Sequence, residues 1–269
     1  DLDVDVDAAS GRIVIARGAT AMLDAAVGRI GVKDGEASYA MEFGMFDIQE
    51  GLAPFTYADR LEIVSAEPLG FRLLAGEREL ATGLIEEHAG GVRVQLTASE
   101  GNDRVVLGAR CTFAHVLGLG AQTHDVDHLG QIVPLWVSEQ GVGKSDTDEL
   151  PTLWQLLGRR HTTHIPMPAF VTDVGAFVVD TAAFARLDLC ATDAGEASIE
   201  VWSNVLALDL YGGDSVRQAQ ARMVDALGRP SPLPSWGLAP WVDAIFGSDA
   251  VRATAARLRE EQIPASALW

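Results

Sequence analysis

A glycine-rich stretch, residues 116–144, contains the first side chains that could do chemistry. It reads VLGLGAQTHDVDHLGQIVPLWVSEQGVGK, with Trp136, Glu139 and Gln140 among its glycines. This density of glycine, amide and acid predicts a structured loop in which the backbone approaches a ligand or a neighbouring segment closely. The alternative is a tight corner between strands. The Gly118-Leu119-Gly120 run is no dinucleotide site, because no third glycine and no helix follow at the required spacing.

The histidines of this stretch suggest two further chemistries. His124 and His128 are spaced as i and i+4, which places two imidazoles together for a metal only on a helix. Glycines flank the stretch, so we expect ordinary polar loop residues and no metal site. His124, His128 and Glu139 are also the candidates for a mutarotase-type acid and base, which would require all three in one cleft. His161 and His164 are interpreted as polar loop residues, and His88 and His115 as structural.

A third group lies near the C-terminus. Residues 236–245 predict a strand, residues 248–261 a helix that Ser248 could cap, and residues 265–269 the start of a second strand. This is one β-α-β unit of a parallel sheet, and alone it cannot bury both faces of its strands. It needs either a barrel of about 250 residues or support from the preceding domain, and we expect the beginning of a barrel.

Asp243 and Phe246 lie at the C-terminal end of the first strand, at the edge where barrel enzymes bind substrate. Asp243 could accept hydrogen bonds from ligand hydroxyls and Phe246 could stack on a ring of the ligand. Alternatively, Phe246 could pack under the helix and Asp243 could cap or pair with a neighbour.

Other catalytic motifs are missing from the sequence. It has no G-x-S-x-G, HExxH, P-loop or CxxC motif. Cys111 and Cys190 lie in strand-like apolar runs, where a thiol is more often part of the core, and whether they pair is left open. Trp241 and Trp269 are expected in a barrel core or interface.

The elements before the last unit are mainly strands. Short runs rich in β-branched and aromatic residues alternate with turn signals, which is typical of a β-sandwich or barrel. The predicted strands are residues 12–16, 37–47, 60–64, 70–74, 91–96, 104–112, 132–137, 176–179, 186–190 and 197–202. A helix is predicted at residues 214–227, with Asp214 as N-cap and Gly228 as C-cap, followed by a proline-rich connector. The predicted domains are 1–212, 213–234 and 235–269.

Composition limits the partners. The chain has 269 residues, 48% of them hydrophobic, and a formal net charge of −18. Such a charge disfavours binding to nucleic acid and to anionic membrane surfaces, whereas a neutral ligand is indifferent to it. No run approaches the roughly 20 apolar residues of a membrane helix, so no membrane insertion is expected. No cofactor motif is present.

Four blocks, in this order and spacing, resemble glycoside hydrolase family 31. They are residues 116–144, in which PLWVSEQGVGK is close to the sulfoquinovosidase-like branch; PMPAFVTDVGAF at 166–177; LGRP with LPSW at 227–236; and LREEQIPASALW at 258–269. The resemblance implies a galactose-mutarotase-like β-sandwich followed by the first β-α-β of a (β/α)8 barrel. It also implies a retaining α-glycosidase whose two catalytic aspartates lie in later barrel strands, so no catalytic residue is expected in these 269 residues.

The resemblance implies substrate-binding roles for Asp243, Phe246, Trp241, Glu139 and Gln140, with a carbohydrate as the ligand. Two positions depart from the family pattern. Ala121 stands where the family commonly has Glu, and Phe246 stands where sulfoquinovosidases carry a substrate-binding glutamine, which favours a neutral sugar. The alternatives are a non-catalytic sandwich that binds carbohydrate or protein through Trp136 and other aromatic rings, and a mutarotase-type epimerase. A homo-oligomer is possible, and a secreted or periplasmic location is slightly favoured over a cytoplasmic one.

Overall fold

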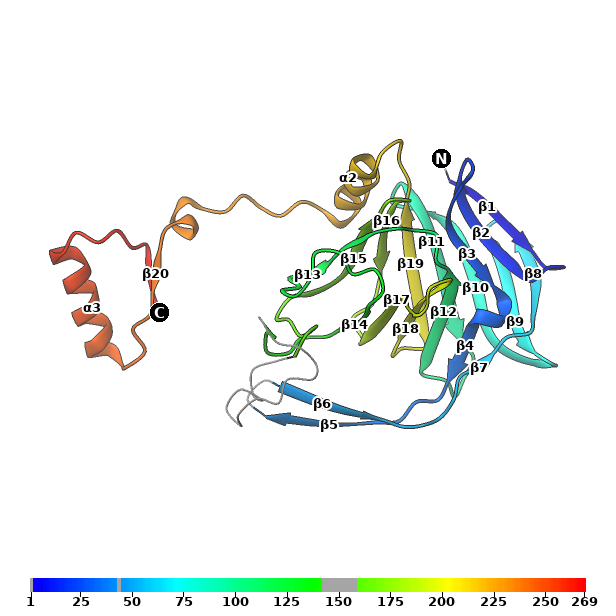
Figure 1. The fold of residues 1–269 in the computed structure, drawn as a ribbon, viewed down its shortest axis with the longest axis horizontal. Coiled ribbons are helices and arrows are strands. Elements are labelled where there is room, and N and C mark those ends of the chain that lie inside the picture. The colour runs from blue at the N-terminus through cyan, green and yellow to red at the C-terminus, as the bar shows by residue number, and fades with distance from the viewer. Residues whose placement is uncertain (1, 43–44, 142–158) are drawn as a thin grey trace. The chain divides into compact units, whose positions relative to one another are not determined.

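The computed structural model describes residues 2–42, 45–141 and 159–269, and these divide into two compact units, Asp1–Leu227 and Gly228–Trp269. The first unit is built from antiparallel sheets (Figure 1). This confirms the prediction of a mainly β chain with a β-sandwich. Among the described residues no helix is long and apolar enough to cross a membrane.

Two large sheets form the first unit. The eight-stranded sheet has the order β13 (Val116–Gly120), β15 (Pro166–Thr172), β16 (Ala176–Val179), β19 (Val205–Tyr211), β11 (Gly91–Ala98), β10 (Arg78–His88), β9 (Leu69–Ala75) and β8 (Arg60–Ala66). The six-stranded sheet has the order β14 (Ile132–Leu135), β17 (Ala185–Asp193), β18 (Glu196–Val201), β12 (Arg104–Arg110), β4 (Ile30–Lys33) and β7 (Thr56–Tyr57).

Smaller elements complete this unit. They are a three-stranded sheet of β1 (Asp3–Asp7), β2 (Arg12–Arg17) and β3 (Thr20–Ala26), the 3-10 turn η1 (Val27–Arg29), the hairpin β5 (Ala37–Glu42) with β6 (Met45–Glu50), and helix α2 (Val216–Leu227). The hairpin is a long two-stranded arm beside the large sheets (Figure 1).

The core comes from alternate residues of the strands. On β11, for example, Val92, Val94 and Leu96 are buried while the residues between them are half-buried, the period-2 pattern of a strand with one face on a core. Phe71, Leu107 and Leu206 join the same apolar cluster from other strands. A second, smaller cluster forms where α2 packs its Ala219 and Met223 on the outer face of β16 and β19.

The disulfide between Cys111 and Cys190, with Cα atoms 6.1 Å apart, settles the question the sequence left open. Cys190 lies in β17, and Cys111 directly follows β12. Of the two possibilities, a disulfide or buried free thiols, the structure has the disulfide. The bond links two strands of the six-stranded sheet that are separated by β18.

Some predicted elements need correction. Residues 37–47 form parts of two strands, because both arms of the hairpin have the same alternating pattern and the pattern alone does not show a reversal. The list of predicted strands lacks β1, β3, β4, β7, β10, β13, β15 and β19. β19 is buried at nearly every position, and a short continuous apolar run has no periodicity that separates it from a helix.

The predicted helix starts were also wrong. Helix α2 begins at Val216, and Ser215 accepts the hydrogen bond of the Gln218 N–H through Oγ (3.3 Å), whereas Asp214 pairs with Arg17 at 3.1 Å. Gly228 has φ +88°, the left-handed conformation expected of a C-terminal glycine.

The second unit contains η2 (Ser235–Leu238), β20 (Trp241–Val242), α3 (Ser248–Glu260) and β21 (Ala267–Leu268). Strands β20 and β21 pair in parallel, in the register Trp241↔Ala267 and Val242↔Leu268. The strand predicted at residues 236–245 is therefore only two residues long and follows a 3-10 turn. Gly247, not Ser248, is the N-cap of α3. The rest of a barrel is not part of this unit.

Candidate functional site

The loop after β20 carries two of the predicted substrate contacts. The N–H of Ala244 donates to the carbonyl of Trp269 (2.7 Å), which continues the parallel pairing beyond Val242. Asp243 is exposed and Phe246 is 89% exposed, and Gly247 turns the chain into α3 with φ +94°. Both residues thus stand at the carboxyl edge of a parallel pair, where barrel enzymes bind their substrates.

Trp241 lies on the strand that leads to this loop. Its ring stacks on Trp236, with centroids 5.7 Å apart and planes 20° apart, and it remains 55% exposed. Trp269 is 72% exposed. Within this unit neither tryptophan is part of a core, which was one of the two positions expected for them.

The sandwich holds Glu139 and Gln140 on a backbone that pairs with residues 162–163. The N–H of Ser138 donates to the carbonyl of Thr163 (3.0 Å), and that of Gly141 to the carbonyl of Thr162 (3.3 Å). A Cβ at Gly141 would meet the carbonyl oxygen of Arg159 at 1.5 Å, so this close approach requires glycine.

The two side chains of this loop differ in their surroundings. Glu139 pairs with Nε2 of His164 at 3.3 Å, and Gln140 is half-buried. A partly exposed carboxylate beside an imidazole can accept hydrogen bonds from ligand hydroxyls. The predicted continuation of this loop to Lys144 lies outside the described residues.

The three mutarotase candidates have different partners. His128 is buried, and desolvation lowers the pKa of its imidazole, which is bonded to the backbone of Gly118, so it is neutral and enclosed. The ring of His124 lies 6.4 Å from that of His161, and Glu139 pairs with His164. The cavities beside Trp136 and Trp202 are lined by none of the three candidates.

The neighbouring acids are held by cations. Arg160 donates to Asp125 at 2.9 Å, and this hydrogen bond lowers the pKa of the Asp125 carboxyl. Over the described ranges no group of three or more His, Cys, Asp or Glu residues could hold a metal ion. The histidines and aspartates at 124–128 therefore take part in ion pairs and hydrogen bonds within the described part of the chain.

The interaction between His115 and Asp127 was not recognised from the sequence. His115 Nδ1 lies 2.6 Å from Asp127 Oδ2, and this bond raises the pKa of His115. The same bond, with backbone N–H donors of Val116 and Leu129, lowers the pKa of Asp127 to about 2. The residues lie 12 apart in sequence, and no periodicity signals such a contact.

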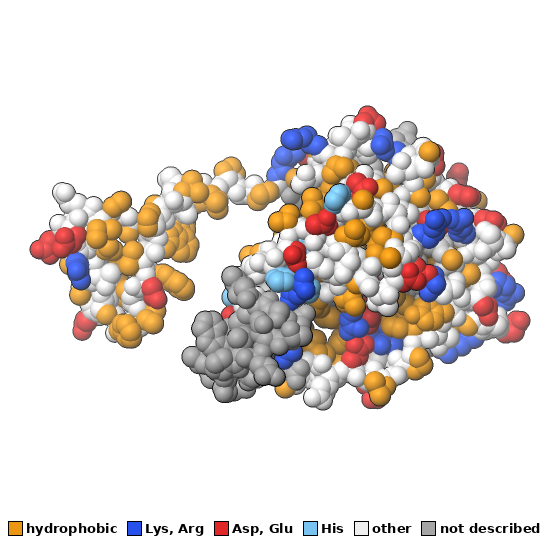
Figure 2. Space-filling view, in the orientation of Figure 1, with side chains coloured by type: hydrophobic (Ala, Val, Ile, Leu, Met, Phe, Trp, Pro, Cys, Tyr) orange, Lys and Arg blue, Asp and Glu red, His pale blue; other side chains and the backbone are white. Residues whose placement is uncertain are grey.

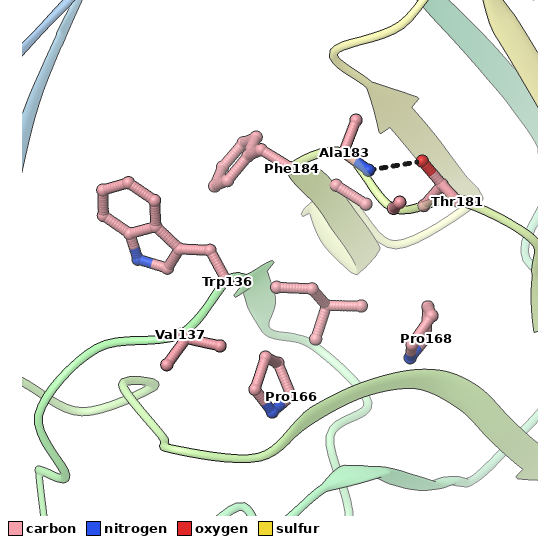
Figure 3. A pocket seen from close by; sticks show the side chains of 10 residues that line it. Trp136, Val137, Pro166, Pro168, Thr181, Ala183 and Phe184 are labelled. Atoms are coloured by element: carbon pink, nitrogen blue, oxygen red, sulfur yellow. Dashed lines mark hydrogen bonds between the residues drawn. The ribbon is translucent and has the colours of Figure 1, made fainter.

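A second feature is a row of aromatic rings beside the six-stranded sheet, the kind of surface that the alternative of a binding sandwich expected around Trp136. Trp136, Pro166, Pro168, Thr181 and Phe184 are among the residues that line a cavity of about 240 Å³ (Figure 3). Of these, Trp136, Pro166 and Pro168 lie in sequence blocks that were singled out, whereas Thr181 and Phe184 do not. The fold brings these separate segments together.

Comparisons with known proteins give the following likenesses. The chain is 28% identical over 170 residues to a sulfoquinovosidase of Agrobacterium fabrum and 29% identical over 129 residues to a sulfoquinovosidase of Escherichia coli, which covers 59% and 45% of this chain. It spans 24% and 18% of the length of those two relatives. No family model matches the sequence.

Among solved structures, a GH31 family sulfoquinovosidase from E. rectale in complex with an aza-sugar inhibitor superposes with a TM-score of 0.77. The match covers 99% of this chain and 40% of that chain at 18% sequence identity, so it shows likeness of fold. Together these likenesses confirm the resemblance to glycoside hydrolase family 31 that the four sequence blocks indicated.

Proposed function

We propose that this chain is the N-terminal part of a retaining α-glycosidase whose substrate is an α-sulfoquinovoside. The parallel pairing of β20 with β21, which puts Asp243 and Phe246 at its carboxyl edge, is the observation that carries the proposal. The two curated relatives are sulfoquinovosidases, and their likeness to this chain supports that substrate class.

In this proposal the described residues bind the sugar and do not cleave it. A retaining glycosidase needs two carboxyl groups about 5–5.5 Å apart, one as nucleophile and one as acid and base. The resemblance assigns both to barrel strands that follow β21. Asp243 accepts hydrogen bonds from sugar hydroxyls, and the exposed rings of Phe246 and Trp241 pack on the apolar face of a pyranose. Glu139 and Gln140 are proposed substrate contacts contributed by the sandwich.

A neutral α-glycoside is the second candidate substrate, and Phe246 favours it. A phenyl ring offers no hydrogen bond where the resemblance implies a glutamine. The net charge of −18 also disfavours a sulfonated sugar relative to an uncharged one.

The disulfide supports a secreted or periplasmic location. Thiols in the cytosol are kept reduced, whereas disulfides persist in oxidising compartments. The pairing of Cys111 with Cys190 is therefore an argument for export.

The test is a hydrolysis assay of the complete reading frame that contains this chain. The substrates are the 4-nitrophenyl α-glycosides of sulfoquinovose, glucose, xylose and galactose, and proton NMR follows the anomer released first. The proposal expects the sulfoquinovoside to be the best substrate, with the α-anomer as first product. Preference for glucoside or xyloside would support the second candidate, and inactivity on all four would refute both.

A variant sharpens the assay. Replacing Phe246→Ala should lower kcat/KM by about tenfold, because it removes one ring from the binding edge. Leu52→Ala, at a side chain 99% exposed on the sandwich, is the matched control and should leave the kinetics unchanged. Equal kinetics of the two variants would remove Phe246 from the proposed site.

A further inference from the structure

Five aromatic rings lie one beside the next in space, along the six-stranded sheet and the hairpin. We call them the aromatic row, and in spatial order they are Phe46, Trp136, Phe184, Trp202 and Tyr39. The centroid of Phe46 is 5.1 Å from that of Trp136, and Trp136 is 5.8 Å from Phe184. Phe184 continues to Trp202 at 4.4 Å, and Trp202 to Tyr39 at 6.4 Å. The rings come from β5, β6 and the ends of β14, β17 and β18.

The row remains open to solvent. Tyr39 is 59% exposed and Phe46 is 38% exposed, whereas Trp136, Phe184 and Trp202 are half-buried. Aromatic side chains that serve only as core are normally enclosed, because each contributes a large apolar area to burial. Contiguous exposed apolar surface of this kind marks a binding site in many soluble proteins.

Two cavities adjoin the row and share Ala183 as a wall. The first, of about 240 Å³, has Trp136, Phe184 and two prolines as apolar walls and the Thr181 hydroxyl on its far side (Figure 3). The second, of about 580 Å³ and more open, extends along Trp202 to Asp34, Asn102 and Asn204. A chain-like ligand could occupy both by passing over Ala183.

The rings are held in place by charged neighbours. The indole N–H of Trp202 donates to Glu200 (2.9 Å), and the Arg104 guanidinium lies 3.7 Å from the centre of the Trp202 ring. Arg186 bonds both Glu200 (3.2 Å) and Glu50 (2.6 Å), and so ties β6 to β17. A surface fixed in this way loses little conformational freedom when a ligand binds.

Glu50 accepts hydrogen bonds from both Lys33 and Arg186. Burial alone raises the pKa of its carboxyl, but hydrogen bonds from Lys33 and Arg186 outweigh burial, and the pKa lies below its ordinary value. The carboxylate is thus charged at neutral pH, and the hairpin that carries Phe46 and Tyr39 is held by ion pairs.

The polar groups of the second cavity indicate the ligand. Within the described parts of the chain, the side chains of Asp34 and Asn204 have no hydrogen-bond partner, and both are exposed. Asp103 uses Oδ1 to accept the N–H of Gly35 (2.8 Å). Two carboxylates and an amide can bond hydroxyl groups, but the carboxylates repel an anion.

We propose that the aromatic row and its two cavities form a binding site for a neutral oligosaccharide. Pyranose rings combine apolar C–H faces, which pack on aromatic rings, with hydroxyl groups at the rim, which suit carboxylate and amide acceptors. An oligosaccharide also has the extended shape that two cavities joined at Ala183 require. Binding at the row is measured on this chain alone, so it does not depend on the proposed hydrolysis.

The test is a binding titration of the 269-residue chain with maltoheptaose, isomaltoheptaose, cellohexaose and xylohexaose, followed by tryptophan fluorescence and saturation-transfer NMR. At least one of these oligosaccharides should bind to the protein. It should bind more tightly than glucose or xylose, because a monosaccharide fills only one cavity. Oligogalacturonate, which is similar in shape but anionic, should bind at least about tenfold more weakly. Absence of binding by all four neutral chains, or equal binding of the anionic chain, overturns the proposal.

Three variants locate the site. Trp136→Ala should weaken binding by about tenfold, as expected for loss of an aromatic anchor. Asn204→Ala should weaken it severalfold without changing the melting temperature, since this side chain is exposed and makes no described bond. Tyr57→Ala is the control, because Tyr57 is 47% exposed and lines neither cavity.

The variants also distinguish binding at the row from binding elsewhere on the chain and from self-association. Normal binding by Asn204→Ala together with weak binding by Tyr57→Ala would place the sugar elsewhere and overturn the proposal. Light scattering measures self-association. Dimerisation that Trp136→Ala abolishes would show instead that the row is covered by a second copy of this chain, which also overturns it.

Discussion

The sandwich and the 228–269 unit differ in where their large apolar side chains lie. In the sandwich Phe71, Leu96 and Leu206 are at most 2% exposed, enclosed between two sheets. In the second unit, all of which is described, Ala244 is the one buried residue, and Trp236, Phe246 and Trp269 are each more than half exposed. Figure 2 shows hydrophobic side chains at the surface of this unit.

The difference follows from the type of sheet. Antiparallel strands that face a second sheet complete a core within one unit, as β11 and β19 do. Parallel strands are normally covered on both faces, and a pair such as β20 and β21 with one helix cannot cover both. The sandwich therefore accounts for its own stability, whereas the second unit needs further apolar surface to bury its rings.

The strongest test of this comparison replaces one phenylalanine in each unit. Phe71→Ala should lower the free energy of unfolding by about 3–5 kcal/mol, because it removes a fully enclosed ring and leaves a cavity. Phe246→Ala should change it by less than about 0.5 kcal/mol, because the ring is already in water. Urea titration followed by circular dichroism measures both, and similar losses would contradict the comparison.

The disulfide gives the next largest expected effect. The double variant Cys111→Ala with Cys190→Ala should lose about 2–4 kcal/mol of sandwich stability, because the unfolded chain regains the freedom of a long loop. The second unit has no cysteine, so its signals should not change. Urea midpoints with and without reductant measure the effect, and an unchanged midpoint of the oxidised wild type on reduction would show that the bond does not contribute.

The smallest expected effect concerns His115 and Asp127. Since Asp127 raises the pKa of His115, NMR titration should place that pKa above 6.5 in the wild type and nearer 6.5 in Asp127→Asn. The stability from this pair is fully present below the unfolded pKa of His and is lost as pH rises through the folded pKa. Identical titration curves of His115 in the two proteins would show that this pair is not formed.

Asp127 adds the opposite dependence at acid pH. Its pKa is lowered to about 2, so its stabilisation is present above the unfolded value near 3.8 and is lost as pH falls towards 2. A sandwich in which Asp127→Asn has the same acid unfolding midpoint as the wild type would show that the pair is not formed.

The sequence predicted local secondary structure better than it predicted which distant residues contact one another. Alternation identified strands such as β11, and Gly228 marked the end of α2 through its need for a positive φ. The reversal between β5 and β6 and the buried strand β19 were missed, since neither changes the local pattern of apolar residues. Ser248 was misplaced as a cap because a glycine one residue earlier takes that position.

The candidate site was predicted in the same way, by position and not by contact. Asp243 and Phe246 were chosen because they follow a strand expected to be parallel, and the parallel pairing is observed. The pairing of Glu139 with His164, and the aromatic row, join segments that are far apart along the chain. Such contacts are set by the register of whole sheets, which no short stretch of sequence encodes.

The amino-acid sequence by itself determined the mainly β character of this protein, the end of α2 at Gly228, and the family blocks that point to a sugar. Each depends on the conformational preference or pattern of neighbouring residues. Only the tertiary structure decided that Cys111 bonds Cys190, that Glu50 ties the hairpin to the sheet, and that five rings form one row. These are long-range contacts, and they form only when burial of the shared core fixes how the strands are paired.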